Sequence, residues 1–196
     1  MIDNLPLISP LLQFPDSDTF YFVTLLQRRK ENKDKQIGCD NRFIKDYYIK
    51  SLDYLTSRYE EIKAICNALN CRAYISLSPR SFRKVAFSSL SYMAKRIEQG
   101  NFECLKGAYN HCVGISSNKD GRLWMIDLDK GVDLHKEEDI QNFLLTLRPQ
   151  GDKLIAKIPS KSGLHLICKP FNYQEFKKEF QNTVVYKNNP TNLYIP

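Results

Sequence analysis

Residues 124–129 read WMIDLD, an apolar run that ends in two carboxylates, Asp127 and Asp129. Because side chains alternate between the two faces of a strand, these carboxylates point the same way. They would repel each other unless a cation lay between them, and oxygen ligands suit Mg²⁺ or Mn²⁺. The alternative is a strand that ends in an exposed turn, where aspartate is also common. The motif alone supports a metal site and an ordinary turn about equally.

The composition predicts a globular protein with an uneven charge. The chain has 196 residues, of which 42% are hydrophobic and 12% aromatic, enough for one large domain or two small modules that share a core. The formal net charge is the number of Lys and Arg residues less the number of Asp and Glu residues. It is +1, +4, −2 and +4 for residues 1–50, 51–100, 101–150 and 151–196, and +7 in all. This distribution suits an acidic metal site within a surface that attracts polyanions. The alternative is a basic protein with solvated lysines.

The cysteines and the chain's apolar segments indicate where the protein works. The six cysteines form no C-x-x-C pair and complete no zinc pattern with the three histidines. Cys66 and Cys168 fall in apolar patterns and are predicted to be buried thiols. No secretory signal and no stretch able to span a membrane is visible. We therefore expect a reduced, cytoplasmic protein without a membrane partner.

The first half of the chain is expected to form a strand, helix, strand, helix unit. A β-branched and aromatic run at 19–27 predicts a buried strand after an irregular leader at 1–19. Apolar residues recur in steps of three and four from Phe43 to Leu69, which predicts the longest helix, ending at Asn70. The remaining expected segments are a charged loop at 28–40, a strand at 72–77, and a helix from the N-cap Ser81 to Gly100 that buries Phe82, Val85, Leu90, Met93 and Ile97.

Three cations lie near the start of that last helix. Arg80, Arg83 and Lys84 are expected to be exposed there, where backbone N–H groups also favour anions. This arrangement suggests contacts with phosphate groups of a nucleic acid. The alternative, which the sequence favours slightly, is simple surface charge on a helix.

The second half alternates strands with short helices. A strand at 122–128 carries the aspartates, and strands at 153–158 and 164–169 are predicted to form a hairpin with a long turn. The apolar pattern at 137–147 predicts a helix. The other expected segments are a short helix at 102–112, a loop at 116–121, a turn at Lys130-Gly131, a helix at 173–180, a strand at 183–186 and an edge segment at 193–196.

The hairpin turn carries a second polar motif, Ser162-Gly163-Leu164-His165. Glycine lets a backbone approach a ligand closely, and Ser162 and nearby backbone N–H groups can donate to phosphate oxygens. A lone histidine on a strand is more often structural than functional. Combined with the acidic strand upstream, however, this motif outlines a nucleoside triphosphate site.

These two motifs, in this order, resemble those of the archaeo-eukaryotic primase superfamily, which includes primase-polymerases and the polymerase domains of bacterial end-joining ligases. The family carries Asp-x-Asp or Asp-x-Glu at the end of an apolar strand, followed by Ser-x-His or Ser-Gly-x-His. The resemblance is firmest from Arg122 to Lys169. It implies an α+β fold with a single primase-like domain at 1–196. In that domain an RRM-like antiparallel or mixed sheet at 116–196 is the catalytic module, and an N-terminal α/β module at 1–115 packs against it.

The resemblance also implies roles for particular residues. Asp127 and Asp129 would hold two divalent ions, Mg²⁺ or Mn²⁺, and His165 would complete the catalytic set. Lys161, Ser162, Gly163 and His165 would bind the phosphates of an incoming nucleoside triphosphate. A 3′-hydroxyl would attack the α-phosphate, while the basic surface holds a DNA template. A helicase or another replication protein is a further expected partner.

One departure from the family's pattern is serious. The family has a third motif, an acidic residue on a strand after the hairpin, whereas here residues 184–187 lead into Asn188 and Asn189. The only carboxylates after Asp152 are Glu175 and Glu179, both on the helix expected at 173–180. Either one of the two asparagines occupies the third position in a weaker site, or catalysis is lost.

Two other hypotheses follow from this departure and from the expected sheet. The first is a non-catalytic nucleic-acid- or nucleotide-binding module with a degenerate site, whose DNA binding would be salt-dependent. The second is a strand-nicking replication initiator, which ranks lower because His165 has no histidine partner two residues away. A P-loop enzyme is disfavoured, since no Gly-rich loop with Lys-Ser or Lys-Thr occurs.

Overall fold

A computed structural model describes residues 1–33, 41–116, 122–129, 131 and 134–196, and the fold is α+β with two antiparallel sheets. The larger sheet has the strand order β1-β10-β4-β2-β3, with β5 paired to β2. Its strands are β1 (Ile2–Asp3), β2 (Thr19–Arg28), β3 (Asn41–Ile49), β4 (Arg72–Ile75), β5 (Arg80–Ser81) and β10 (Thr191–Ile195).

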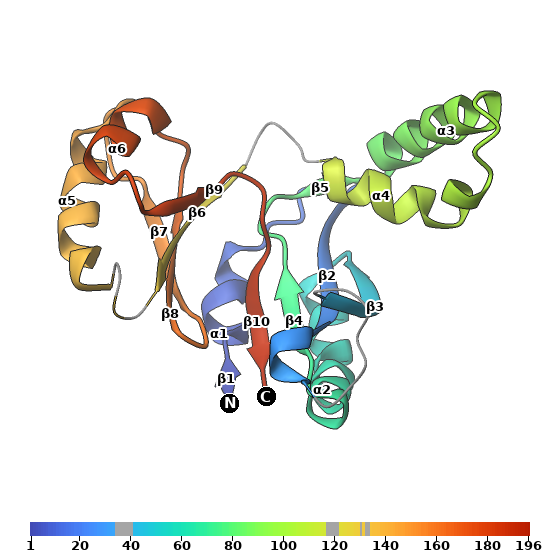
Figure 1. Cartoon of the computed structure of the whole chain (residues 1–196), viewed down its shortest axis with the longest axis horizontal. Helices are drawn as coiled ribbons and strands as arrows, with labels where there is room; N and C mark the ends of the chain where they lie inside the picture. Colours follow the sequence, from blue (N-terminus) through green and yellow to red (C-terminus); the bar gives the residue numbers. More distant parts are fainter. Residues whose placement is uncertain (34–40, 117–121, 130, 132–133) are drawn as a thin grey trace.

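The smaller sheet has the strand order β7-β8-β6-β9. Two helices cover one of its faces (Figure 1), where Ile126, Leu166 and Phe176 belong to a shared core. Residues on the other face, among them Met125 and Ile167, join the core of the larger sheet. The two sheets therefore face each other. The elements are β6 (Trp124–Asp129), β7 (Leu154–Pro159), β8 (Gly163–Cys168), β9 (Val184–Tyr186), α5 (Glu137–Thr146) and α6 (Tyr173–Glu179).

The other helices belong to the part of the chain that carries the larger sheet. α2 packs on that sheet, whereas α3 and α4 lie together and project away from it (Figure 1). Within the described residues, every helix is too short or too polar to cross a membrane. The helices are α1 (Leu5–Ile8), α2 (Leu52–Leu69), α3 (Phe82–Glu98) and α4 (Ala108–Ile115), and the 3-10 segments are η1 (Ser9–Leu11), η2 (Arg29–Glu31), η3 (Glu103–Gly107) and η4 (Leu134–Lys136).

The helix predicted from Phe43 is wrong over its first turns, because residues 41–49 form β3 and pair with β2. Tyr48 lies opposite Phe22, and the centroids of their rings are 5.6 Å apart. Cross-strand aromatic pairs stabilise a sheet. Aromatic residues also lose side-chain freedom in a helix, so this segment gains more from pairing with β2 than from extending α2.

α2 begins and ends at polar residues. Ser51 precedes it, and its Oγ accepts a hydrogen bond from the N–H of Tyr54 at 3.0 Å. Leu55 and Ile62, on the face toward the sheet, are fully buried. The predicted end is confirmed, because Asn70 adopts the left-handed conformation with φ of 48°.

α3 has the N-cap predicted from the sequence but not the predicted burial. Ser81 Oγ accepts a hydrogen bond from a backbone N–H of the first turn at 3.0 Å. Val85 is fully buried, whereas Leu90 and Ile97 are 60% and 50% exposed. The prediction that both are buried is wrong, because α3 packs against α4 by the face that carries Val85, and Leu90 and Ile97 are outside that core cluster.

The C-terminal strand is not the edge segment expected. β10 lies between β1 and β4, and Leu193, Tyr194 and Ile195 are all buried. It thus returns the chain to the larger sheet, and the boundary expected at 115–116 does not separate the two sheets. The leader at 1–19 is also more regular than expected, since it contains β1 and α1.

Most other expected elements of the second half are confirmed. β7 and β8 form the antiparallel hairpin, and α5, α6 and β9 fall where helices and a strand were expected. The Cys66 and Cys168 thiols are buried and free, as predicted. The expected loops at 28–40 and 116–121 and the turn at Lys130 lie partly or wholly outside the described residues.

Candidate functional site

Asp127 on β6 and His165 on β8 lie directly opposite each other. Nε2 of His165 is 3.4 Å from Oδ1 of Asp127. The other ring nitrogen, Nδ1, is 2.7 Å from the hydroxyl oxygen of Thr191 on β10. Groups from both sheets therefore orient the imidazole, and they do so on the face of the smaller sheet that meets the larger one.

The surroundings of His165 keep its ring neutral. Burial lowers the pKa of His165 to about 4, the Asp129 carboxylate opposes this, and the Arg72 guanidinium lowers the pKa further. At pH 7 the ring therefore carries a single N–H. In the tautomer with the proton on Nε2, this N–H points toward Asp127. Nδ1 then accepts a hydrogen bond from the Thr191 hydroxyl. Such a ring can donate to an anion without adding charge.

Asp129 sits at the hairpin turn, opposite Gly163. Ser162 Oγ donates a hydrogen bond to Oδ1 of Asp129 at 3.2 Å. A Cβ atom placed on Gly163 would lie 1.9 Å from the carbonyl oxygen of Leu128, so only glycine fits at this position. The turn is thus held tightly against the end of the acidic strand, and Ser162 and Asp129 form one exposed edge.

A carboxylate from the larger sheet's part of the chain binds two cations at the same edge. Nε of Arg72 is 3.0 Å from Oε2 of Glu31, and Nζ of Lys161 is 3.2 Å from Oε1 of Glu31. Burial raises the pKa of Glu31, but hydrogen bonds and charge from Arg72 and Lys161 outweigh it, and the net pKa is lowered. Neither Glu31 nor Arg72 was singled out from the sequence.

These groups surround a cavity of about 450 Å³ between the two sheets. Its floor carries the acidic pair and His165, and its rim carries cations from β2, η2 and the hairpin turn. The same cations Arg28 and Lys30 also line a neighbouring basic hollow with Arg29 and Lys33. The lining residues are Leu26, Arg28, Lys30, Asn41, Arg72, Tyr74, Met125, Asp127, Asp129, Ser160, Lys161, Ser162, His165, Tyr186, Asn189, Pro190 and Asn192.

Asn192 of β10 supplies the cavity with an uncommitted oxygen. Its side chain is 2% exposed, and its Oδ1 atom makes no hydrogen bond. A buried polar atom without a partner costs free energy, so a ligand in the cavity is the natural partner for it. Asn189 lines the same cavity, while Asn188 does not. Asn192, which the sequence did not indicate, therefore lines the same cavity as the acidic pair and Asn189.

The donor set can be compared with the needs of a divalent ion. Two carboxylates and one carboxamide oxygen are ligands that Mg²⁺ and Mn²⁺ accept. Within the described residues, however, no three His, Cys, Asp or Glu side chains form a metal-binding cluster. The residues fit an oxygen-ligated ion, but they supply less negative charge than three carboxylates would.

The three cations expected near the start of α3 lie away from this cavity. The expectation that Arg80 is exposed is wrong: it is 3% exposed, and its guanidinium donates to Val113 O at 2.6 Å and Ser76 Oγ at 2.7 Å. Burial lowers the pKa of Arg80 to about 10, so it remains charged. Arg83 and Lys84 are exposed on α3. Arg80 therefore has a structural role, joining β5 to α4.

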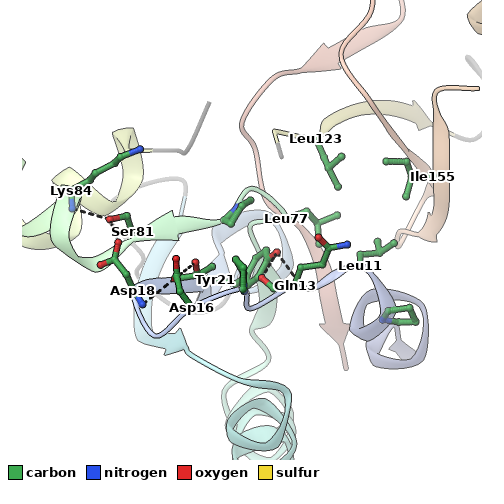
Figure 2. A pocket seen from close by; sticks show the side chains of 14 residues that line it. Leu11, Gln13, Asp16, Asp18, Tyr21, Leu77, Ser81, Lys84, Leu123 and Ile155 are labelled. Atoms are coloured by element: carbon green, nitrogen blue, oxygen red, sulfur yellow. Dashed lines mark hydrogen bonds between the residues drawn. The ribbon is translucent and has the colours of Figure 1, made fainter. Parts of the chain in front are cut away.

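A second cavity, of about 620 Å³, lies between the chain before β2 and the start of α3, with Leu123 and Ile155 on its far side (Figure 2). Its carboxylates are committed to local structure. Oδ1 of Asp18 accepts the N–H of Arg83 at 2.8 Å, and Asp16 accepts the Thr19 hydroxyl at 2.6 Å. Asp18 thus joins the chain before β2 to the start of α3, and Asp16 bonds the start of β2, so these carboxylates do not mark a ligand site.

Comparisons with protein-family models, curated proteins and solved structures find no match for this chain. The cavity between the sheets is therefore the feature that indicates what the chain can bind. In it, residues that are far apart in the sequence meet around one concave, polar surface.

Proposed function

We propose that this chain is a primase- or polymerase-like nucleotidyltransferase, which transfers a nucleotide to a 3′-hydroxyl on a DNA template. The observation that carries the proposal is the meeting of Asp127, Asp129 and His165 around one cavity with a cationic rim. Carboxylates suit a divalent ion, and a neutral imidazole beside lysine and arginine suits phosphate oxygens. A nucleoside triphosphate with its metal ion needs both.

The order of elements in the smaller sheet supports an RRM-like catalytic module. The chain runs β6, α5, β7, β8, α6, β9, which is the β-α-β-β-α-β order of ferredoxin-like and RRM-like sheets. The two motifs lie on the central strands β6 and β8. Helices on the opposite face support these strands and leave the site open toward the larger sheet.

Asp127, Asp129 and Asn192 would hold Mg²⁺ or Mn²⁺ in this site. When bound, such ions stabilise the attacking and leaving oxygens of phosphoryl transfer. The chain's own part is to bring these oxygen ligands from two sheets to one cavity. Because Asn192 is neutral, we expect the ion to bind more weakly than it would to three carboxylates.

The hairpin turn would hold the phosphates. Ser162 and the Gly163 N–H can donate to phosphate oxygens, and neutral His165 can donate its Nε2–H. Lys161 would exchange its contact with Glu31 for a phosphate oxygen. Arg72 remains bound to Glu31 in this scheme, because its side chain is almost fully buried.

The basic hollow next to the cavity is the proposed path of the template. Arg28, Arg29, Lys30 and Lys33 line it and can bind successive phosphates of a DNA backbone. Such contacts carry no sequence preference, and their strength falls with salt. A replication protein such as a helicase would present that template.

A specific observation favours a second candidate, a nucleotide- or nucleic-acid-binding module without catalysis. Asn192, rather than a third carboxylate, lines the cavity with the acidic pair, and among the described residues no three His, Cys, Asp or Glu side chains form a metal-binding cluster. This alternative keeps the cationic rim and predicts DNA binding that is unaffected when the acidic pair is replaced.

Primer extension with Mn²⁺ or Mg²⁺ distinguishes the two candidates. The wild type is compared with the Asp127→Asn plus Asp129→Asn protein, and salt-dependent binding of a template-primer DNA is measured on both. Product from the wild type and none from the variant, with DNA binding kept by both, supports the nucleotidyltransferase. Equal product from both proteins contradicts the role of the carboxylates. Absence of product from both, with DNA binding intact, supports the binding module.

A further inference from the structure

One ion pair joins the parts of the chain that carry the two sheets, at the edge of the cavity between them. Glu31 lies on η2, which follows β2 of the larger sheet, and Lys161 lies in the hairpin turn between β7 and β8 of the smaller sheet. Nζ of Lys161 is 3.2 Å from Oε1 of Glu31, although 130 positions separate the two residues in the sequence. Because Lys161 lines the cavity, this contact holds one of its cations at the rim.

The same carboxylate binds a second cation that lines the cavity. Arg72 donates to both oxygens of Glu31, and its Nε is 3.0 Å from Oε2. An arginine fork with a lysine beside it is an arrangement that binds either a carboxylate or a phosphate group. The Glu31 side chain is therefore an internal anion in a place that also suits an anionic group of a ligand.

Glu31 reduces the positive charge that the cavity offers to a ligand. Among the described residues that line the cavity, the cations are Arg28, Lys30, Arg72 and Lys161. Two of these four donate to Glu31. A polyphosphate that enters the cavity must therefore compete with a carboxylate of the protein itself.

The two partners of Glu31 differ in how easily they can leave it. The side chain of Arg72 is 6% exposed, whereas that of Lys161 is 55% exposed. Glu31 is itself held in place, because Nδ2 of Asn70 donates to its backbone carbonyl oxygen at 3.0 Å. An exposed ion pair contributes little free energy, so Lys161 can exchange Glu31 for a ligand. Arg72 cannot do so without leaving a buried carboxylate short of a partner.

We propose that Glu31 is an autoinhibitory residue, which holds Lys161 at the rim and lowers the affinity of the cavity for a nucleoside triphosphate until the phosphates take Lys161 from it. This inference rests on the proposed function, which assigns Lys161 to the phosphates. Its distinct consequence is that removal of the Glu31 carboxylate strengthens triphosphate binding, whereas removal of the Lys161 ammonium group weakens it. An ion pair with a structural role alone would strengthen binding in neither case.

Two variants of the full chain free Lys161 in different ways. Glu31→Gln removes the carboxylate but leaves the buried Arg72 without its counter-ion, which can impair folding. Glu31→Gln plus Arg72→Gln removes one charge of each sign, so the net charge is unchanged and no buried charge loses its partner. We call these two proteins the Glu31 variants, and circular dichroism compares their fold with that of the wild type.

The first measurement tests the contact in the ligand-free protein. Lysines are acetylated with a limiting amount of acetic anhydride, and mass spectrometry gives the relative rate at each lysine. Lys161 should react about twofold or more faster in the Glu31 variants, because no carboxylate then occupies its ammonium group. The control is Glu61→Gln, since Glu61 also joins a lysine, Lys45 of β3, to an arginine of α2, outside the cavity. That control should speed the reaction of Lys45 and leave Lys161 unchanged.

The second measurement tests the inhibition. A non-hydrolysable nucleoside triphosphate with Mn²⁺ is titrated into each protein by isothermal titration calorimetry. The Glu31 variants should bind it about threefold or more tightly than the wild type, Lys161→Gln should bind it more weakly, and Glu61→Gln should differ from the wild type by less than about 1.5-fold. Addition of Lys161→Gln to either Glu31 variant should remove the gain, because Glu31 acts through Lys161.

Three results would overturn the autoinhibitory role of Glu31 alone. They are unchanged labelling of Lys161 in the Glu31 variants, triphosphate binding of equal affinity in these variants and the wild type, and a gain in affinity that persists after Lys161→Gln. The last result would mean that the charge of Glu31 acts without the contact. Faster labelling of Lys161 with no triphosphate binding by any protein would instead contradict the nucleotidyltransferase proposal, and the inhibitory role would fail with it.

Discussion

At the residue scale, the tightest fit in the site is between Gly163 and the backbone of Leu128. A Cβ at Gly163 would lie 1.9 Å from the Leu128 carbonyl oxygen, and a neighbouring backbone cannot yield as a flexible side chain can. We expect Gly163→Ala to lower the free energy of unfolding by about 1–3 kcal/mol, as overpacking does, and to displace Ser162 from Asp129. Urea unfolding measures the first effect.

Gly114 of α4 is the matched control for that substitution. Nothing lies within 4 Å of a Cβ placed there, and the residue is inside a helix, where alanine is favoured over glycine. Gly114→Ala should raise the free energy of unfolding by about 0.5–1 kcal/mol. Equal changes in the two variants would mean that β6 and β8 do not approach as closely as described.

A pH dependence follows from Asp46 on β3. Burial raises the pKa of Asp46 to about 6, although the Thr24 hydroxyl acts in the opposite direction. The unfolded chain loses this proton near its usual pKa of 3.8, so between pH 4 and 6 folding takes up a proton and stability falls as pH rises. The free energy of unfolding of Asp46→Asn, relative to that of the wild type, should therefore increase as the pH rises from 4 to 7. The expected increase is about 1 kcal/mol after allowance for partial exposure. Urea unfolding at both pH values checks it, and a pH-independent difference would contradict the raised pKa.

At this scale the sequence predicted the residues that lie in short motifs. Asp127 and Asp129 share a strand face by alternation alone, and His165 follows a glycine turn. Thr191 and Asn192 could not be predicted, because Thr191 reaches His165 and Asn192 reaches the cavity only when β10 enters the other sheet. No local pattern records such a long-range contact.

At the scale of elements, two residues, Lys50 and the N-cap Ser51, separate β3 from α2. Ser51 Oγ accepts the N–H of Tyr54, which satisfies a donor of the first helical turn. We expect Ser51→Ala to cost about 1 kcal/mol in urea unfolding. Ser57, inside the same helix, donates only to the carbonyl of Tyr54, so Ser57→Ala should be neutral or slightly stabilising. Equal losses of unfolding free energy in Ser51→Ala and Ser57→Ala would show that the Ser51 cap does not define the start of α2.

The same boundary explains why the helix prediction failed. The aromatic residues of β3 fall at steps that also fit a helix, so the apolar period continues from residue 43 through residue 69. The true signals were the aromatic content of 43–48 and Ser51 itself, which is a typical N-cap residue. Elements with one dominant signal, such as β2 and the β7–β8 hairpin, were predicted correctly.

At the scale of the molecule, β10 joins the two sheets. It pairs with β1 and β4, and Thr191 at its start contacts His165 of the smaller sheet. From the sequence, residues 193–196 were expected to form an edge segment, whereas β10 lies between β1 and β4. The consequence is that the two sheets should unfold together.

Leu193→Ala tests this coupling. Leu193 is fully buried in the core of the larger sheet, and its truncation should cost about 2–5 kcal/mol. Trp124, the single tryptophan, reports on the smaller sheet, while far-UV circular dichroism reports on the whole chain. Both transitions should shift equally in Leu193→Ala, and neither should shift in Leu145→Ala, which alters an exposed side chain. A tryptophan transition that stays unchanged in Leu193→Ala would show that the sheets unfold independently.

The most direct test of the cavity's role is Mn²⁺ binding followed by electron paramagnetic resonance, with and without a non-hydrolysable nucleoside triphosphate. The comparison protein is Asp127→Asn plus Asp129→Asn, and the control, Glu138→Gln plus Glu179→Gln, removes the same charge from exposed helix positions. The predicted result is that the wild type and the control bind Mn²⁺, more tightly when the nucleotide is present, and that the Asp127 and Asp129 variant loses about tenfold or more in affinity. Equal Mn²⁺ affinity in all three proteins would contradict the account.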